Sequence, residues 1–280
     1  MMKQTDFRSK ILLLILFVVH INTFAQQTTV RITFKQNCLQ LISNQLIDTP
    51  VVLNKFIYQN ECGTKYQINQ IQYFISDIEL HVNGEWIGNP EVCFGNPRLF
   101  VNNCCYIDCE NEPIGLQFTI KKNKISIDSI RFVFGIPKDK NIPYSFSNPE
   151  LARMYWPEAL GGGYHYMKTN IKFIDKQDSV SLFNCHLGRG VGNDTFIDND
   201  FAMTFPCKLT FNSKKATPYF YPRIDIIMHV EKWFSQPNKI DFNLYTKGIM
   251  GKQDIMSQLC ENGKNVFEVD PYLWYEVSQF

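Results

Sequence analysis

The stretch that decides the fold is Gln70-Ile-Gln-Tyr-Phe-Ile-Ser-Asp-Ile-Glu-Leu-His-Val82, which is followed directly by Asn83-Gly84. Its alternation places five residues on one face, namely Phe74, Ser76, Ile78, Leu80 and Val82. A period of two is typical of a β-strand that buries one face. Asn-Gly favours a two-residue hairpin turn because both residues tolerate positive φ. The sequence therefore predicts a long strand that turns back after residue 82.

Similar β-rich segments lie on both sides of this strand, at 30–34, 115–120, 124–134, 164–173, 180–187, 201–211, 221–234 and 239–245. We expect 115–120 and 124–134 to pair around a charged turn. Short helices are expected near 149–156, where Asn148 can cap the helix, and near 252–259. About ten strands without a dividing linker predict an all-β protein, a single large antiparallel β-sandwich with one or two short helices.

Composition limits the class of protein. The chain has 280 residues, a net charge of +1, 45% hydrophobic and 14% aromatic residues. This much apolar material builds a core and excludes a disordered chain. A charge near zero argues against a nucleic-acid partner, because such proteins carry a basic surface.

The N-terminus reads as a secretory signal peptide over residues 1–25. Lys3, Arg8 and Lys10 precede an apolar run from Ile11 to Val19, and cleavage is expected after Ala25. The run is too short for a stable membrane anchor, which needs about 20 apolar residues; an uncleaved anchor is the alternative. We expect a secreted or periplasmic domain over 26–280, with no membrane span after cleavage.

All nine cysteines follow residue 25. An oxidising compartment favours disulfides for most of them, and the odd count leaves at least one thiol over. Cys104, Cys105 and Cys109 fit a disulfide loop better than a redox motif.

No familiar enzyme signature stands in the sequence, neither G-x-S-x-G, H-E-x-x-H, a P-loop nor G-x-G-x-x-G. We therefore expect a protein that is not an enzyme. A copper-dependent or thiol-based oxidoreductase is a remaining alternative. A loop with Asp194, Asp198, Asn199 and Asp200 offers oxygen ligands for calcium, although its spacing differs from an EF-hand.

Strand parity separates the four histidines of the mature chain. His81 shares a strand face with Asp77 and Glu79, and His229 shares one with Asp225 and Glu231, so both are expected to face water. His165 lies on the same strand face as the apolar residues Met167, Ile171 and Phe173, so it is expected to point inward.

His186 ends a strand just before Gly188, at a sheet rim where ligands commonly bind. Two imidazoles, His165 and His186, with Met154 and Trp156 nearby, would suit copper, because copper accepts neutral nitrogen and thioether ligands. The alternative for His165 is a core histidine bonded to a backbone carbonyl.

Several motifs resemble those of MbnP-like proteins, in the same order along the chain. Tyr66 to Leu80 resembles their "L-x-Y-Y-I-S-N-I-x-L" strand, and Ile130-Arg-Phe-Val-Phe-Gly-Ile136 their "I-x-F-x-I-G-V" strand. Met154-Tyr-Trp-Pro-Glu-Ala-Leu-Gly-Gly-Gly-Tyr-His-Tyr-Met-Lys168 is similar to "M-x-W-x-x-G-Y-x-F-x-K", and Asn184-Cys-His-Leu-Gly188 contains their "H-x-G".

The resemblance implies a periplasmic or secreted β-sandwich, in a family named for a protein encoded beside the copper-chelating peptide methanobactin. Related copper proteins bind the metal with two histidines and a tryptophan oxidised to kynurenine. Carried over by motif, His186 is the H-x-G histidine and Trp156 the M-x-W tryptophan. Thr169-Asn170 stand where the family commonly has Glu-Gly after the lysine.

We therefore expect a secreted copper-binding protein whose metal site is formed by His165, His186, Trp156 and Met154. The alternative is an extracellular binding or structural module without metal, for which the aromatic runs Tyr219–Tyr221 and Tyr272–Tyr275 could form a surface.

Overall fold

The structure is a computed structural model that describes residues 27–43, 45–189, 202–215, 217, 220–246 and 248–275. The expected signal peptide, the acidic loop with Asp194 and the aromatic Tyr219 lie outside these residues. None of the helices in the described part of the chain is long and apolar enough to cross a membrane.

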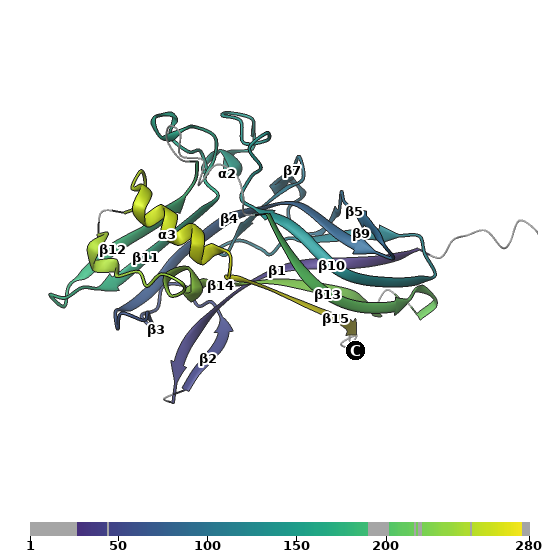
Figure 1. Ribbon diagram of the computed structural model, residues 1–280, viewed down its shortest axis with the longest axis horizontal. Helices are drawn as coiled ribbons and strands as arrows, with labels where there is room; N and C mark the ends of the chain where they lie inside the picture. The colour runs from purple at the N-terminus through teal and green to yellow at the C-terminus, as the bar shows by residue number, and fades with distance from the viewer. Residues whose placement is uncertain are drawn as a thin grey trace, which may run out of the picture.

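Two sheets form the body of the protein (Figure 1). Within the described residues, the six-stranded sheet has the order β15-β14-β1-β9-β6, with β2 attached to β1. Its strands are β1 (Thr28–Ile42), β2 (Gln45–Pro50), β6 (Glu91–Phe94), β9 (Gly115–Ile120), β14 (Phe220–His229) and β15 (Phe267–Tyr275). Their pairings are antiparallel except for that of β1 with β14, which is parallel.

The second sheet has nine strands in the described ranges and the order β12-β11-β4-β10-β13. Its strands are β3 (Tyr58–Gln59), β4 (Lys65–Val82), β5 (Glu85–Ile87), β7 (Phe100–Val101), β8 (Cys104–Asp108), β10 (Lys124–Phe134), β11 (Met167–Ile174), β12 (Val180–Leu187) and β13 (Ala202–Asn212). Strands β3, β5 and β8 also pair with β4. The expected all-β sandwich is confirmed.

Strand β4 is the long strand that the sequence predicts. Its five alternating residues from Phe74 to Val82 are all buried. Asn83 (φ 51°) and Gly84 (φ 89°) then form the turn to β5. Asp77 has φ 49° and lies where the pairing with β10 shifts register, so β4 buries side chains on both faces before Asp77 and alternates after it.

Three expectations about strands are wrong. Residues 230–234, expected to continue the strand from 221, form the 3-10 helix η4 (Val230–Phe234). Strands β9 and β10 belong to different sheets, because residues 121–123 cross between the layers instead of closing a hairpin. The segment 239–245 contains the 3-10 helix η5 (Phe242–Leu244) in place of a strand. Asp241 accepts a hydrogen bond from the Asn243 amide there, and the ring of Phe242 stacks on Phe183 at 4.5 Å. Side-chain capping and aromatic packing thus override the strand propensity.

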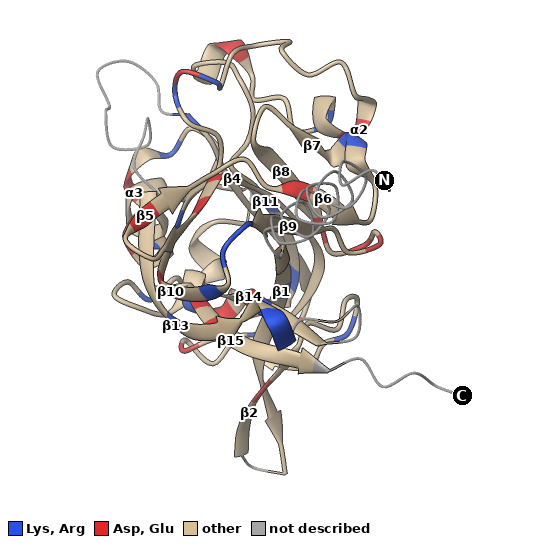
Figure 2. Cartoon of the chain, turned by 90° about the vertical axis from the view of Figure 1, so that its right-hand side faces the viewer, with Lys and Arg blue, Asp and Glu red and all other residues tan. Residues whose placement is uncertain are grey.

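The two expected helices are present. Helix α2 (Pro149–Ala152) is capped by Asn148, which accepts from the Glu150 amide, and α3 (Gln253–Gly263) packs against the 3-10 helix η4 (Val230–Phe234). The remaining 3-10 helices are η1 (Pro97–Leu99), η2 (Glu158–Leu160) and η3 (Ser213–Lys215). Basic and acidic residues are interspersed along the strands and loops, in keeping with the net charge (Figure 2).

The nine cysteines are all free thiols, so the expected disulfides, including the loop at Cys104, Cys105 and Cys109, are not formed in this structure. Six of them are buried and pack as small apolar side chains in the core. Burial raises their pKa, that of Cys104 to about 11 and those of Cys207 and Cys260 to about 12.

Candidate metal centre

The four residues expected to form a metal site come from two parts of the chain that meet at one end of β12. Met154 and Trp156 lie between α2 and η2, and His165 lies just before β11. The segment at 154–156 runs beside the segment at 163–165, through Trp156 N–H to the Gly163 carbonyl (2.8 Å) and His165 N–H to the Met154 carbonyl (2.6 Å). Strand β12 then brings His186 to this pair of segments.

The two imidazole rings lie close together in a nearly perpendicular, edge-to-face arrangement. The ring centroids of His165 and His186 are 5.2 Å apart at an interplanar angle of 80°. The indole of Trp156 meets the His165 ring in the same edge-on manner, with centroids 4.7 Å apart. The sequence therefore located a real cluster, although its members are up to 32 residues apart in the chain.

His165 keeps one ring nitrogen without a partner. Its Nδ1 lies 2.9 Å from the Met154 carbonyl oxygen, which can only accept, so Nδ1 carries the proton. Its Nε2 therefore holds a lone pair, is buried and has no hydrogen-bond partner. The carbonyl contact expected of a core histidine is thus present, and it also leaves the other nitrogen free as a ligand.

His186 is oriented by a chain of amides. Its Nε2 lies 2.9 Å from Oδ1 of Asn170, and Nδ2 of Asn170 donates to Oε1 of Gln70 at 2.8 Å. The amide nitrogen of Gln70 in turn donates to Glu110 at 3.1 Å. This chain directs the Asn170 oxygen at the imidazole, so His186 carries its proton on Nε2 and its lone pair on Nδ1.

Burial keeps both imidazoles neutral. It lowers the pKa of His165 to about 3, and the pKa of His186 to about 4 with a further contribution from the charge of Lys168. Lys168 is the cross-strand neighbour of His186, and its Nζ donates to the Arg153 carbonyl at 3.3 Å. Neutral imidazole is the form that binds a metal, so protons do not compete for this pair near neutral pH.

Trp156 forms a wall of the site. Its side chain is fully buried, and its indole nitrogen donates to the Leu160 carbonyl at 2.6 Å. The ring packs on Gly188, the glycine of the H-x-G motif, where a Cβ would come within 2.4 Å of the indole. The M-x-W and H-x-G motifs therefore meet in space. Met154 is also buried, and its carbonyl oxygen is the atom that contacts His165.

In the described ranges, no group of three or more His, Cys, Asp and Glu side chains gathers in a way that could hold a metal ion. A metal at the imidazole pair would therefore be held by two histidines, with any further contact from Met154 or Trp156. The orphaned Nε2 of His165 fits such a metal, since a lone pair buried without a partner costs free energy that a ligand bond would recover.

The other two histidines lie outside this centre. His81 is half-buried, contacts Asp128 at 2.7 Å and packs on the Trp86 ring. His229 was expected to face water and does not: it is buried, with Glu268 at 3.0 Å and Asp48 at 3.5 Å. The parity argument failed because β2 and β15 bring these carboxylates over it.

Strand parity correctly predicted that His165 is buried, but not that it lies outside the regular strand. The residue is buried as expected, but a bend at Tyr166 separates it from the regular alternation of β11. Sequence reasoning assigned no role to Asn170, which holds His186. Asn170 stands where the family commonly has glycine, and this difference was the one sequence signal that pointed to it. The strand register that places Asn170 near His186 cannot be predicted from local sequence.

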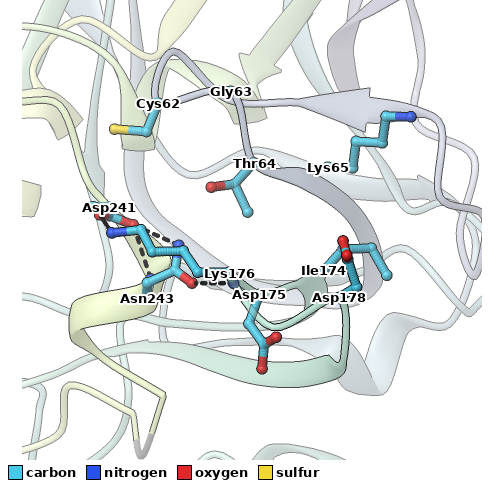
Figure 3. A pocket seen from close by; sticks show the side chains of 10 residues that line it. All are labelled: Cys62, Gly63, Thr64, Lys65, Ile174, Asp175, Lys176, Asp178, Asp241 and Asn243. Atoms are coloured by element: carbon cyan, nitrogen blue, oxygen red, sulfur yellow. Dashed lines mark hydrogen bonds and ion pairs between the residues drawn. The ribbon is translucent and has the colours of Figure 1, made fainter.

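A separate open cavity of about 490 Å³ lies away from the imidazoles, beside the turns after β3 and β11 (Figure 3). Lys176 and Asp241 form an ion pair at 3.2 Å in its wall, and the exposed thiol of Cys62 stands at its edge. Two of its carboxylates accept hydrogen bonds from their own turns, Asp175 from the Ser179 amide and Asp241 from the Asn243 amide. Among the described residues, no cluster of metal-binding side chains forms at this cavity.

Two stacked sheets and a histidine pair, His165 buried and His186 partly buried, define an all-β protein with a candidate metal centre at one end of its nine-stranded sheet. The profile of the MbnP family matches residues 27–256, so the chain belongs to the MbnP family, as its motifs predicted. Among solved structures it is similar to "MbnP from Methylosinus trichosporium", with 11% identity, a TM-score of 0.48, and coverage of 88% of this chain and 99% of that chain. None of the curated protein sequences matches it.

Proposed function

We propose that the protein is a secreted or periplasmic copper-binding protein that sequesters or carries the metal without catalysing a reaction. The observation that carries this proposal is the unpartnered, buried Nε2 of His165 beside the ring of His186. Membership of the MbnP family, which is linked to methanobactin and copper, supports the choice of metal.

The chemistry of the donors favours copper in its monovalent state. Two neutral imidazoles supply no negative charge, and burial disfavours a doubly charged ion that stays uncompensated. Hard cations such as calcium and magnesium prefer oxygen ligands, which this centre lacks on the side chains that form it. The indole of Trp156 adds a soft, polarisable neighbour, and the thioether of Met154 would be a further soft ligand; both suit Cu(I).

Each surrounding group has a positioning role in this proposal. The Met154 carbonyl fixes the tautomer of His165, and Asn170 fixes that of His186. Trp156 closes the site on one side, because its ring packs between His165 and Gly188. Pre-oriented ligands lose less entropy on binding and therefore bind more tightly.

The test is metal loading of the mature chain. Purified protein is incubated with Cu(I), Cu(II) or Zn(II), desalted, and assayed by ICP-MS. We expect copper loading at a fixed ratio that disappears in the His165→Ala, His186→Ala double variant. His81→Ala is the matched control, since His81 lies by Asp128 outside the centre. A double variant that is folded by circular dichroism and still loads copper fully would contradict the proposal.

A further inference from the structure

A hairpin projects from the body of the protein at the end of the six-stranded sheet (Figure 1). Strand β1 continues for five residues beyond Asn37, where its pairing with β14 ends, and is paired there with β2. The tip carries exposed apolar side chains, with Leu46 66% and Leu41 51% exposed. Exposed apolar residues concentrated on a short strand pair mark an interaction surface.

One face of this hairpin borders a groove. The register pairs Leu41 with Leu46 on one face, and Ile42 with Gln45 on the other. The leucine face lines a cavity of about 350 Å³, which joins a second cavity of about 520 Å³ through shared lining residues. We call these two together the hairpin groove; its lining includes Leu39, Leu41, Leu46, Glu61 and Glu231, and Lys232 lines the second cavity.

One carboxylate of the groove interacts electrostatically with His229 but has no lysine or arginine partner among the described residues. Glu61 forms an ion pair with Lys239 at 3.1 Å. Glu231 accepts a hydrogen bond from the Leu39 amide at 3.2 Å, and no lysine or arginine of the described chain forms an ion pair with it. Burial raises the pKa of the Glu231 carboxyl. A cation brought to it would relieve this cost.

The backbone beside the groove offers a free strand edge. Asn37 pairs with His229 of β14 on one edge of β1 and with Pro50 of β2 on the other. Beyond Asn37, the edge of β1 that faces β2 stays paired. On the opposite edge of β1, where β14 ends, no strand of the described residues continues the pairing. The Leu39 amide on that edge is satisfied by the Glu231 side chain. An extended segment could add a strand there.

We propose that the hairpin groove docks an extended segment of a partner protein in which a lysine or arginine is flanked at two residues' distance by apolar residues, so that all three side chains point to the same face. The segment lies along residues 39–42 in the place that β14 vacates, its apolar side chains against Leu41 and Leu46 and its basic side chain at Glu231. Charge complementarity selects this occupant over a second copy of the hairpin, because residues 38–50 contain no lysine or arginine.

The test is fluorescence anisotropy with two labelled probes, Gly-Leu-Thr-Lys-Thr-Leu-Gly, whose leucines and lysine share one face, and the same peptide with glutamate for lysine. We expect saturable binding of the lysine peptide alone. Glu231→Gln, which keeps an acceptor for the Leu39 amide, and Leu41→Ser, Leu46→Ser should each weaken it at least about tenfold. Ile42→Ser, Ile47→Ser on the opposite face is the matched control and should bind normally. Hydrogen exchange at the Leu41 amide should slow when the peptide is bound.

Several results would overturn the proposal: equal binding of the two peptides, no saturation up to about 1 mM, or equal losses in the leucine and isoleucine variants. Concentration-dependent dimerisation in analytical ultracentrifugation that the leucine variant abolishes would identify a second copy as the occupant instead. Binding to phosphatidylglycerol vesicles that depends on the hairpin would identify a membrane. His165 and His186 are unchanged in all these variants, so the outcome is independent of copper loading.

Discussion

The indole of Trp156 lies directly on Gly188, so closely that the space for a side chain at position 188 is already filled by the ring. This contact joins the segment after α2 to the end of β12, and it places the wall of the candidate metal centre beside His186. The glycine of the H-x-G motif is therefore required by packing, whereas the histidine of the motif supplies a lone pair.

Replacing Gly188 tests this contact. Gly188→Ala should lower the free energy of unfolding by about 1–3 kcal/mol, because the added methyl displaces the indole in a filled core. Urea denaturation measures the loss, and copper loading should fall with it. Gly88→Ala is the control, since a Cβ there would meet only the flexible Glu79 side chain at 3.4 Å. Equal stability of the two variants would contradict the packing argument.

Asn170 is expected to tune the metal affinity through His186. Asn170→Ala removes the acceptor of the imidazole N–H and should weaken copper binding about 10- to 100-fold. Competition with a chelator of known affinity measures this change. Asn170→Asp keeps an acceptor and should retain most of the affinity. Asn184, the cross-strand neighbour of Asn170, provides the control Asn184→Ala. An unchanged dissociation constant in Asn170→Ala would refute the role.

The two imidazoles of the candidate centre should make stability depend on pH. Their pKa values in the folded state, about 3 and about 4, lie below the unfolded value, so the unfolded chain binds more protons as the pH falls below about 6.5. Each histidine should cost about 2 kcal/mol of stability between pH 7 and pH 5. Urea titrations at both pH values measure the slope. Replacing both residues with glutamine should flatten it, and an unaltered slope would show that other groups cause it.

The cysteines can be examined by alkylation without reduction. Denatured protein should take up nine alkyl groups, because all nine thiols are free. In the native state only Cys62 should react quickly, since it is the exposed cysteine and burial raises the pKa of the core thiols. Cys62→Ser should remove the fast phase. A mass that corresponds to fewer than nine groups would reveal disulfides and restore the expectation from the sequence.

Local patterns in the sequence predicted the strands well and their partners poorly. The bounds of β9, β10 and β12 agree with the alternating segments, and Asn83-Gly84 gives the expected turn, because these features depend on neighbouring residues alone. The separation of β9 and β10 into different sheets depends on packing across the whole molecule, as does the parallel pairing of β1 with β14. Neither leaves a local signal.

The candidate site shows the same division. Motif and parity led to His165, His186, Trp156 and Met154, and the structure brings them together. The hydrogen bond between Asn170 and His186 depends on strand register, and the burial of His229 depends on β2 and β15. Both arise from contacts between segments distant in the sequence, so neither could be read from it.

The parallel pairing of β1 with β14 also has a consequence for the order of folding. Arg31 in β1 lies opposite Arg223 in β14, so the first strand gains this neighbour only after most of the chain is available. Contacts of such long range slow folding. A chain that crosses a membrane before it folds would thus stay unfolded enough for translocation until nearly its whole length had emerged. Its six-stranded sheet would be completed last.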